Sequence, residues 1–225
     1  MRNTQERLLK IFHKLLDIFG KRHWWPGETP LEVIVGAVLT QNTTWKNVEK
    51  AINNMKNKGI LNLDTLYFID VKELSQIIRP AGYYNLKSIR LKNIVKVLYE
   101  KYNASIDNLG NIPTDELRKI LLNINGVGKE TADSILLYAL NRPIFVVDAY
   151  TKRLLNNHKP ILMEDNIGVN LEKNKDHYDH IQLFFMKNLP LDIYIYNEYH
   201  ALIVCLCQQY CKRMPDCIGC PLHGF

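Results

Sequence analysis

A short glycine turn between two apolar-periodic segments constrains the fold of this chain more than any other feature. Gly126-Val127-Gly128 separates residues 114–122 from residues 130–140, and both segments have the apolar spacing of amphipathic helices. Two glycines around one apolar residue permit a tight turn with positive φ and close backbone approach. Such a turn presents N–H groups beside the positive end of a helix dipole, where Lys129 adds a cation, so it favours an anion. An ordinary helix–helix turn is the alternative, because G-x-G alone is a weak signal.

A single carboxylate follows the next apolar run along the chain. Asp148 comes directly after Ile144–Val147. This run is too short and isolated for a convincing strand, so we expect a buried loop that leads into a helix. A carboxylate at such a junction is a candidate for chemistry beside the anion bound by the turn.

Nearly every periodic segment of the chain favours an α-helix, and strand signals are almost absent. Helices are predicted over residues 5–19, 31–39, 45–55, 71–78, 85–102, 114–122 and 130–140. The mixed polar stretch 156–182 predicts a loop and the start of a helix. The sequence therefore predicts an all-α fold.

Composition and charge agree with a soluble protein that meets a polyanion. The chain has 225 residues, 47% hydrophobic content, a net charge of +6 and a pI near 9.0, which suits a nucleic-acid partner but is also compatible with a merely basic protein. No apolar run is long enough to span a membrane. The first 20 residues alternate charge and apolar side chains, as in an amphipathic helix rather than a signal peptide. We expect a cytoplasmic, nucleoid-associated protein.

The cysteines gather at the C-terminal end of the sequence. Five occur, at positions 205, 207, 211, 217 and 220. A cytoplasmic protein does not accumulate disulfides, so a metal centre is the natural interpretation. Cys205 lies in an apolar run and is expected to pack as a small apolar residue.

Three segments resemble the endonuclease III superfamily of DNA glycosylases. LLNINGVGKETADSILLYA and FVVDAYTKR are similar to its helix-hairpin-helix and Gly/Pro…Asp signature, and PLEVIVGAVLTQNT is similar to its early helix and the following loop. The matching positions of the signature are Leu122, Gly126, Val127, Gly128, Thr131, Ala132, Val147, Asp148 and Arg153. With the cysteine-bearing end, the resemblance covers about residues 30–220. It implies that Gln41 fills the hole left by an extruded base.

The resemblance implies two helical lobes and a metal cluster. A helical barrel is expected over residues 23–135, and residues 1–22 with 136–225 are expected to form the second lobe, which ends in a cysteine loop over 205–225. The resemblance implies a [4Fe–4S] cluster on Cys207, Cys211, Cys217 and Cys220. The first gap of this loop has five residues instead of the family's six, and no cysteine follows Cys220, so the fourth thiolate is expected upstream, at Cys207 or Cys205. Zinc on Cys211, Cys217, Cys220 and His223 is the alternative.

The chain departs from the lyase-type members of that family at one position. Glu130 stands where those members have the lysine that forms a Schiff base, and Lys129 is one residue earlier. One residue turns a side chain by about 100° around a helix, and a carboxylate cannot form an imine. The sequence therefore resembles a monofunctional glycosylase of the 3-methyladenine branch. Glu130 shapes the base pocket, holds a water, or caps the helix start.

The resemblance implies a monomeric enzyme that acts on damaged double-stranded DNA, with Asp148 stabilising an oxocarbenium-like sugar. Gln41, Gly126, Val127, Gly128 and Lys129 are the expected DNA-binding residues. Two alternatives stay open. One is a bifunctional glycosylase and AP lyase of the endonuclease III type, which needs a different lysine. The other is a helix-hairpin-helix DNA-binding module without catalysis.

Several other residues favour structural roles. Lys87, Arg90 and Lys92 are predicted to lie on a solvated helix face, and His200 is predicted to be buried with its polar atoms satisfied. Trp24 and Trp25 are predicted to pack in the core or at the seam between the lobes more readily than to stack on an extruded base.

Overall fold

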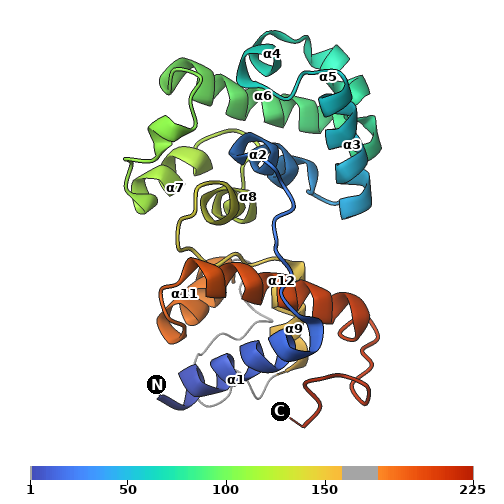
Figure 1. Cartoon of the computed structure of the whole chain (residues 1–225), viewed down its shortest axis with the longest axis vertical. Helices are drawn as coiled ribbons and strands as arrows, with labels where there is room; N and C mark the ends of the chain where they lie inside the picture. Colours follow the sequence, from blue (N-terminus) through green and yellow to red (C-terminus); the bar gives the residue numbers. More distant parts are fainter. Residues whose placement is uncertain (1, 159–176, 225) are drawn as a thin grey trace. The chain divides into compact units, whose positions relative to one another are not determined.

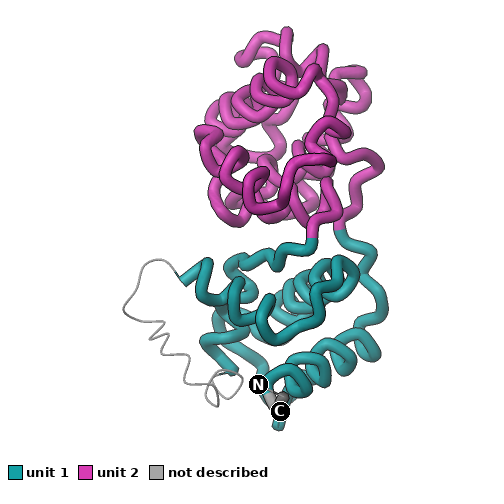
Figure 2. The backbone as a smooth tube through the Cα atoms, turned by 90° about the vertical axis from the view of Figure 1, so that its left-hand side faces the viewer, with its two compact units in different colours: residues 1–24, 143–225 teal, residues 25–142 magenta. Residues whose placement is uncertain are grey.

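The chain forms two compact units that consist of helices and irregular segments. The computed structural model describes residues 2–158 and 177–224, and it contains no strand within those ranges. One unit comprises Met1–Trp24 with Pro143–Phe225, and the other comprises Trp25–Arg142 (Figure 2). The predicted all-α fold is confirmed. The sequence analysis placed the two boundaries between the lobes after residues 22 and 135. In the structure the boundaries between the units fall after Trp24 and Arg142.

The unit Trp25–Arg142 is built around one helix that is buried on every side. α2 (Pro30–Leu39) contacts α3, α6, α8 and the π turn η3, and it lies in the middle of its unit (Figure 1). Every residue from Leu31 to Leu39 is buried, which its almost uninterrupted apolar sequence requires. Thr29 fixes its start by accepting a hydrogen bond from the Glu32 N–H at 3.2 Å.

The other helices of this unit lie around α2. In chain order they are α3 (Trp45–Asn57), α4 (Leu63–Phe68), α5 (Val71–Ile77), η1 (Arg79–Ala81), α6 (Tyr84–Lys101), η2 (Asp107–Leu109), α7 (Thr114–Leu122), α8 (Lys129–Ser134) and the π turn η3 (Ile135–Ala139). The predicted single helix over 130–140 is therefore an α-helix followed by a π turn, in which the Leu140 N–H donates to the Ile135 carbonyl at 3.1 Å. All five residues of the turn are buried.

The other unit is centred on its last helix. It contains α1 (Arg2–Phe19), α9 (Ala149–Asn157), α11 (Tyr178–Asn188) and α12 (Ile193–Gln209). α12 contacts α1 and α9. Aromatic packing forms much of the core, because Phe145 stacks on Phe185 with ring centroids 4.1 Å apart and Tyr199 donates a hydrogen bond to the Leu8 carbonyl at 2.9 Å.

The helix start that was predicted within 156–182 is confirmed, because α11 begins at Tyr178. α4 and α12 were not predicted from the sequence. α4 has six residues and α12 is apolar around most of its circumference, so neither gives the one-sided apolar stripe on which the prediction depends. The loop predicted within 156–182 falls largely on residues 159–176, outside the described part of the chain. Among the described residues, no helix is both long enough and apolar enough to cross a membrane.

Candidate active site

The glycine turn joins two helices that a buried ion pair ties together. Arg118 of α7 donates to both carboxylate oxygens of Asp133 in α8, at 2.7 and 3.0 Å. Asp133 is fully buried, and a bidentate guanidinium is the strongest partner available for such a charge. Within the turn, the Val127 N–H donates to the Ile124 carbonyl at 3.0 Å, and both side chains are buried. The predicted hairpin therefore forms, and its geometry is fixed by packing.

The two glycines of the turn have different conformations. Gly126 has a φ of +94°, and a Cβ there would lie 2.3 Å from Cγ of Arg90. Gly128 has a φ of −91° and a ψ of 176°, and a Cβ at this position would meet no atom within 4 Å. The expectation of positive φ at both glycines is wrong for Gly128, which is the N-cap of α8. A glycine N-cap has no side chain to cover the N–H groups of the first turn.

Both ends of the Gln41 carboxamide have partners, the hairpin at Nε2 and α6 at Oε1. Its Nε2 donates to Thr131 Oγ1 at 2.9 Å and to the Gly126 carbonyl at 3.4 Å. Its Oε1 accepts a hydrogen bond from Arg90 Nη1. The loop after α2 and the helix-hairpin-helix are thus joined by side-chain hydrogen bonds.

The prediction that Lys87 and Lys92 are solvated is wrong. Lys87 is 1% exposed, and its Nζ donates to the carbonyls of Leu39 at 2.8 Å and Ala81 at 2.7 Å. Burial lowers the pKa of Lys87 to about 8, and the charge of Arg90 contributes to this lowering.

Lys92 has a similar role. Its Nζ donates to the carbonyls of Leu66 and Ile69 at 3.0 and 2.9 Å, and to that of Tyr67. These ammonium groups therefore satisfy carbonyls at helix C-terminal ends.

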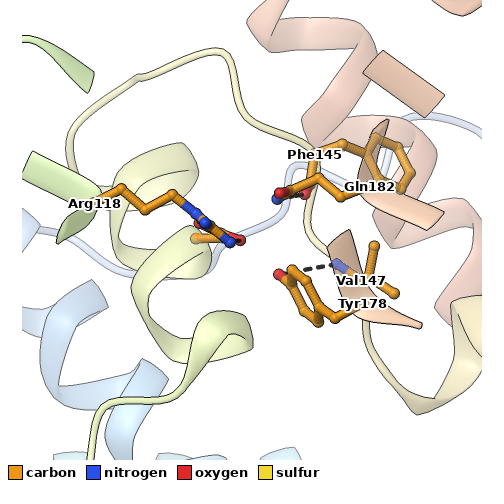
Figure 3. A network of polar contacts seen from close by, with 6 residues as sticks. Arg118, Phe145, Val147, Tyr178 and Gln182 are labelled. Atoms are coloured by element: carbon orange, nitrogen blue, oxygen red, sulfur yellow. Dashed lines mark hydrogen bonds and ion pairs between the residues drawn. The ribbon is translucent and has the colours of Figure 1, made fainter. Parts of the chain in front are cut away.

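Residues 144–147 form the buried irregular segment that the sequence predicted. Phe145, Val146 and Val147 are almost fully buried. Two side chains of α11 form hydrogen bonds with the backbone of this segment. Gln182 Nε2 donates to the Phe145 carbonyl at 2.7 Å, and Tyr178 Oη accepts from the Val147 N–H at 3.4 Å (Figure 3). A non-helical backbone can stay buried only with such partners.

Asp148 ends this segment and is the N-cap of α9. Its Oδ1 accepts hydrogen bonds from the Thr151 N–H at 2.7 Å and from Thr151 Oγ1 at 3.0 Å. Its Oδ2 lies 3.5 Å from Nε2 of His200 on α12, and the two side chains are 12% and 8% exposed. His200 is buried as predicted, but its pairing with a carboxylate far away in the sequence was missed.

The surroundings of Asp148 favour its ionised form. Burial alone raises the pKa of this carboxyl group, but the charge of His200 and the hydrogen bonds from His200 and Thr151 lower it, and the resulting pKa is below the usual value. The start of α9 adds the positive end of a helix dipole. Asp148 is therefore a charged, oriented carboxylate with little access to water.

Glu130 and Lys129 lie in the first turn of α8. Glu130 is exposed and Lys129 is half-buried. An acidic side chain in the first turn of a helix interacts favourably with the dipole, which fits the capping interpretation of Glu130.

The cysteines occupy the end of α12 and the segment after it. Cys205, Cys207, Cys211 and Cys220 are buried, Cys217 is exposed, and none forms a disulfide. Cys207 and Cys211 are neighbours: burial raises the pKa of Cys207, and the charge and hydrogen bonding of Cys211 raise it further. Cys205 instead accepts a hydrogen bond from Gln209 at 3.2 Å.

Four or five cysteine thiols are the donor type that an iron–sulfur cluster or zinc requires. Their sulfur atoms are not arranged around a common centre in this structure. Cys211 Sγ accepts from Asn157 Nδ2 at 3.2 Å, and Cys220 Sγ accepts from the Leu222 N–H at 3.4 Å. N–H donors of this kind stabilise cluster thiolates. In the described ranges, no three His, Cys, Asp or Glu side chains form a ready-made site for a single metal ion.

A family model described as "HhH-GPD superfamily base excision DNA repair protein" matches residues 35–167. The chain belongs to this superfamily. The matched range contains the Gln41 loop, the hairpin and Asp148, which were the sequence-based candidates. As its relatives are named as DNA glycosylases, this HhH-GPD protein is a DNA repair glycosylase.

Individual HhH-GPD relatives extend the likeness over almost the whole chain. A Methanocaldococcus jannaschii protein, which its name proposes to be a DNA repair glycosylase, is 50% identical over 225 residues, 99% of this chain and 97% of its own length. The solved structure of an H. pylori 3-methyladenine DNA glycosylase bound to 1,N6-ethenoadenine has a TM-score of 0.74 and 30% identity, covering 92% of this chain and 97% of that one. A trapped covalent complex of endonuclease III with DNA has a TM-score of 0.75 at 22% identity, covering 97% and 93%, and supports the fold.

Proposed function

We propose that this HhH-GPD protein is a monofunctional glycosylase that removes an alkylated base from double-stranded DNA. The observation that carries the proposal is the setting of Asp148, a buried carboxylate that Thr151 and His200 hold in one orientation with a lowered pKa. Such a group stays ionised near neutral pH. It offers a fixed negative charge to an oxocarbenium-like sugar, where preorganised charge is most effective.

The proposed reaction is hydrolysis of the N-glycosidic bond. The bond between the sugar and the base breaks heterolytically, and its electron pair leaves with the base. Asp148 stabilises the cation that forms at the sugar carbon, and it accepts a proton from the water that adds there. An alkylated purine that carries a positive charge becomes neutral as it leaves, so this substrate class needs little acid catalysis.

The lysines near the hairpin support a monofunctional reaction. Glu130 occupies the position of the lyase nucleophile and cannot form an imine. Lys87 has a lowered pKa of about 8, as a nucleophilic lysine would, but it is 1% exposed and is bonded to two carbonyls. It is therefore a structural ammonium group, and the bifunctional alternative lacks this replacement for its nucleophile.

An aromatic cluster supports the proposed class of base. Trp25 contacts Trp45 with ring centroids 5.3 Å apart and Tyr138 with centroids 5.4 Å apart. Both tryptophans are half-buried, so the cluster combines core packing with accessible ring surface. Electron-rich rings attract a cationic, alkylated base. The H. pylori relative is named a 3-methyladenine DNA glycosylase, and adenine methylated at N3 in DNA is a cationic base of this class.

We propose that Gln41, Gly126, Val127, Gly128 and Lys129 contact damaged double-stranded DNA. The hairpin would hold a phosphate through N–H groups and the Lys129 charge, which positions the duplex without reading its sequence. Gln41 would fill the space of the extruded base. A monomer suffices for this arrangement, because all the proposed residues come from one chain.

We also propose that Cys207, Cys211, Cys217 and Cys220 hold a [4Fe–4S] cluster. The neighbouring positions of Cys207 and Cys211 favour Cys207 over Cys205 as the fourth ligand. The bound cluster would link the end of α12 to the segment that follows it. Zinc held by Cys211, Cys217, Cys220 and His223 is the alternative. In that case the purified protein would be colourless and would contain one equivalent of zinc.

A cleavage screen over defined lesion duplexes tests the function. Duplexes with alkylated purines, oxidised pyrimidines, uracil or thymine mismatches are incubated with the protein, and strand breaks are counted with and without later alkali. We expect breaks on alkylated-purine duplexes only after alkali. Breaks without alkali would support a bifunctional enzyme, and binding without base release on any duplex would support a non-catalytic module.

A further inference from the structure

One arginine of α6 contacts both elements that are proposed to meet DNA. The Arg90 guanidinium donates a hydrogen bond to Oε1 of Gln41, in the loop after α2. The aliphatic stem of Arg90 covers the α-carbon of Gly126, where a Cβ would lie 2.3 Å from Arg90 Cγ and 2.9 Å from its Cδ. Gln41 in turn donates to Thr131 Oγ1 at 2.9 Å. Arg90 therefore occupies the junction between the loop and the hairpin.

Two other residues on the same face of α6 hold the same elements. Lys87, Arg90 and Asn93 are spaced three residues apart, so they lie along one face of the helix. Lys87 Nζ donates to the Leu39 carbonyl at the end of α2 at 2.8 Å. Asn93 Nδ2 donates to the Asn125 carbonyl in the hairpin at 3.0 Å. Both elements are thus anchored to one 18-residue helix, and Arg90 is the residue that reaches a DNA-binding side chain.

We propose that Arg90 is a positioning residue that holds the Gln41 carboxamide in register with the hairpin. The wedge side chain and the phosphate-binding turn then meet DNA as one preorganised element. This inference rests on the proposed function, because Gln41 has to act on the DNA for its position to matter. The physical gain is entropic: a glutamine fixed before binding loses less rotamer freedom on forming the complex than a mobile one.

The arrangement also explains why the hairpin needs glycine at position 126. A side chain there would displace the Arg90 stem from its present place. Arg90 is half-buried, and its planar fork suits a carboxamide oxygen. A phosphate contact by Arg90 is the competing role, and it predicts a different dependence on salt, since each neutralised phosphate adds to the salt slope.

The test uses three variants of α6 in the full chain. Arg90→Met keeps an unbranched stem above Gly126 and removes the hydrogen-bond donor, whereas Arg90→Lys keeps a charged donor. Lys96→Met is the matched control, because Lys96 is an exposed cation of the same helix. Each is combined with Gln41→Ala. The probe is a duplex with a non-hydrolysable tetrahydrofuran abasic site beside 2-aminopurine, whose fluorescence reports unstacking. Binding is measured at several salt concentrations.

We expect Arg90→Met to weaken binding by about tenfold, comparable to the loss of one charge-assisted hydrogen bond, and to reduce the 2-aminopurine signal. The salt slope should match that of wild type, and Arg90→Lys should recover part of the signal. In the Gln41→Ala background, Arg90→Met should have no further effect. In the free protein, Arg90→Met should speed hydrogen exchange at the Gln41 carboxamide, which a purely structural role would leave unchanged.

An additive effect in the Gln41→Ala background, or a salt slope lower by about one, would overturn the inference in favour of a phosphate contact. Gln41→Ala binding the probe as wild type does would overturn it as well. None of these measurements involves base release. A protein that fails the lesion screen but shows the coupling would therefore lose its proposed activity and keep this inference.

Discussion

Nε2 of His200 lies 3.5 Å from Oδ2 of Asp148, and these two side chains come from positions more than fifty residues apart in the sequence. The other carboxylate oxygen is held by Thr151 at the start of α9. Each oxygen of Asp148 therefore has its own partner, and both partners favour the charged form. A carboxylate held in this way should control both the rate of base release and its dependence on pH.

Asp148→Asn should abolish most of the base release and leave the fold intact. Asparagine caps a helix about as well as aspartate, but it lacks the negative charge. Single-turnover excision should fall by about two to four powers of ten, on the order of 3–5 kcal/mol of transition-state stabilisation. Asp192→Asn is the matched control, because Asp192 caps α12 in the same way. Unimpaired excision by Asp148→Asn would place catalysis elsewhere.

The low pKa of Asp148 predicts how stability and excision depend on pH. A carboxyl group with a pKa below its unfolded value, near 3.8, stabilises the protein above that value and loses this contribution as pH falls through the folded pKa. Excision should therefore show no acidic loss from Asp148 between about pH 7 and 5. Denaturant unfolding, extended to pH values below 3.8, and single-turnover excision between about pH 7 and 5 provide the measurement.

His200→Gln should raise the pH at which excision begins to fall on the acidic side. Burial then raises the Asp148 pKa with less opposition, so excision should fall at a pH where wild type remains active. The charge of Asp148 also acts on Cys207, which is unchanged in the variant. His180→Gln, at an exposed histidine of α11, should leave the pH profile unaltered. An identical profile for His200→Gln would contradict the assigned role of the imidazole.

The two hairpin glycines should respond differently to alanine. Gly126→Ala combines a positive φ with displacement of the Arg90 stem, and should cost on the order of 2–4 kcal/mol of unfolding free energy. Gly128→Ala should change stability by less than about 1 kcal/mol, because its φ is negative and its Cβ meets open space. That open space is where the hairpin would approach a phosphate, so Gly128→Ala should weaken DNA binding. Equal stability losses in the two variants would contradict the backbone geometry.

The proposed cluster should give the purified protein a brown colour with broad visible absorption, because thiolate-to-iron charge transfer is coloured. Cys217→Ser should bleach it, and Cys205→Ser should keep it, since Cys205 pairs with Gln209 instead. Iron and zinc analysis completes the measurement. A colourless protein with one equivalent of zinc would favour the alternative ligand set.

Borohydride should not trap a covalent protein–DNA complex. Trapping requires an imine from an accessible amine, whereas the position proposed for the nucleophile holds Glu130 and Lys87 is buried. A lyase-type glycosylase incubated with its own substrate is the positive control. Efficient trapping by this protein would identify it as bifunctional, and mapping of the cross-linked lysine would name the nucleophile.

Local signals in the sequence were sufficient to predict the helical class, the hairpin and the buried segment before Asp148. These signals are apolar periodicity and the Gly-Val-Gly turn. The N-cap role of Asp148, three residues before Thr151, was not predicted, although aspartate at such a spacing is typical of a cap. The cluster of cysteines was equally visible, because it is a matter of spacing along the chain.

The partners of these residues could be known only from the folded chain. His200 faces Asp148 because α12 packs against α9, and no local pattern relates the two. Lys87 and Lys92 were predicted to be solvated because a charge on a helix usually is, yet carbonyl groups of Leu39 and of the segment 66–69 hold them. Gly126 and Gly128 are the same residue type, and their different φ angles are set by the packing of the hairpin against α6. Pairwise contacts between remote segments fix the charge state and orientation of a side chain, and a single sequence carries no record of those contacts.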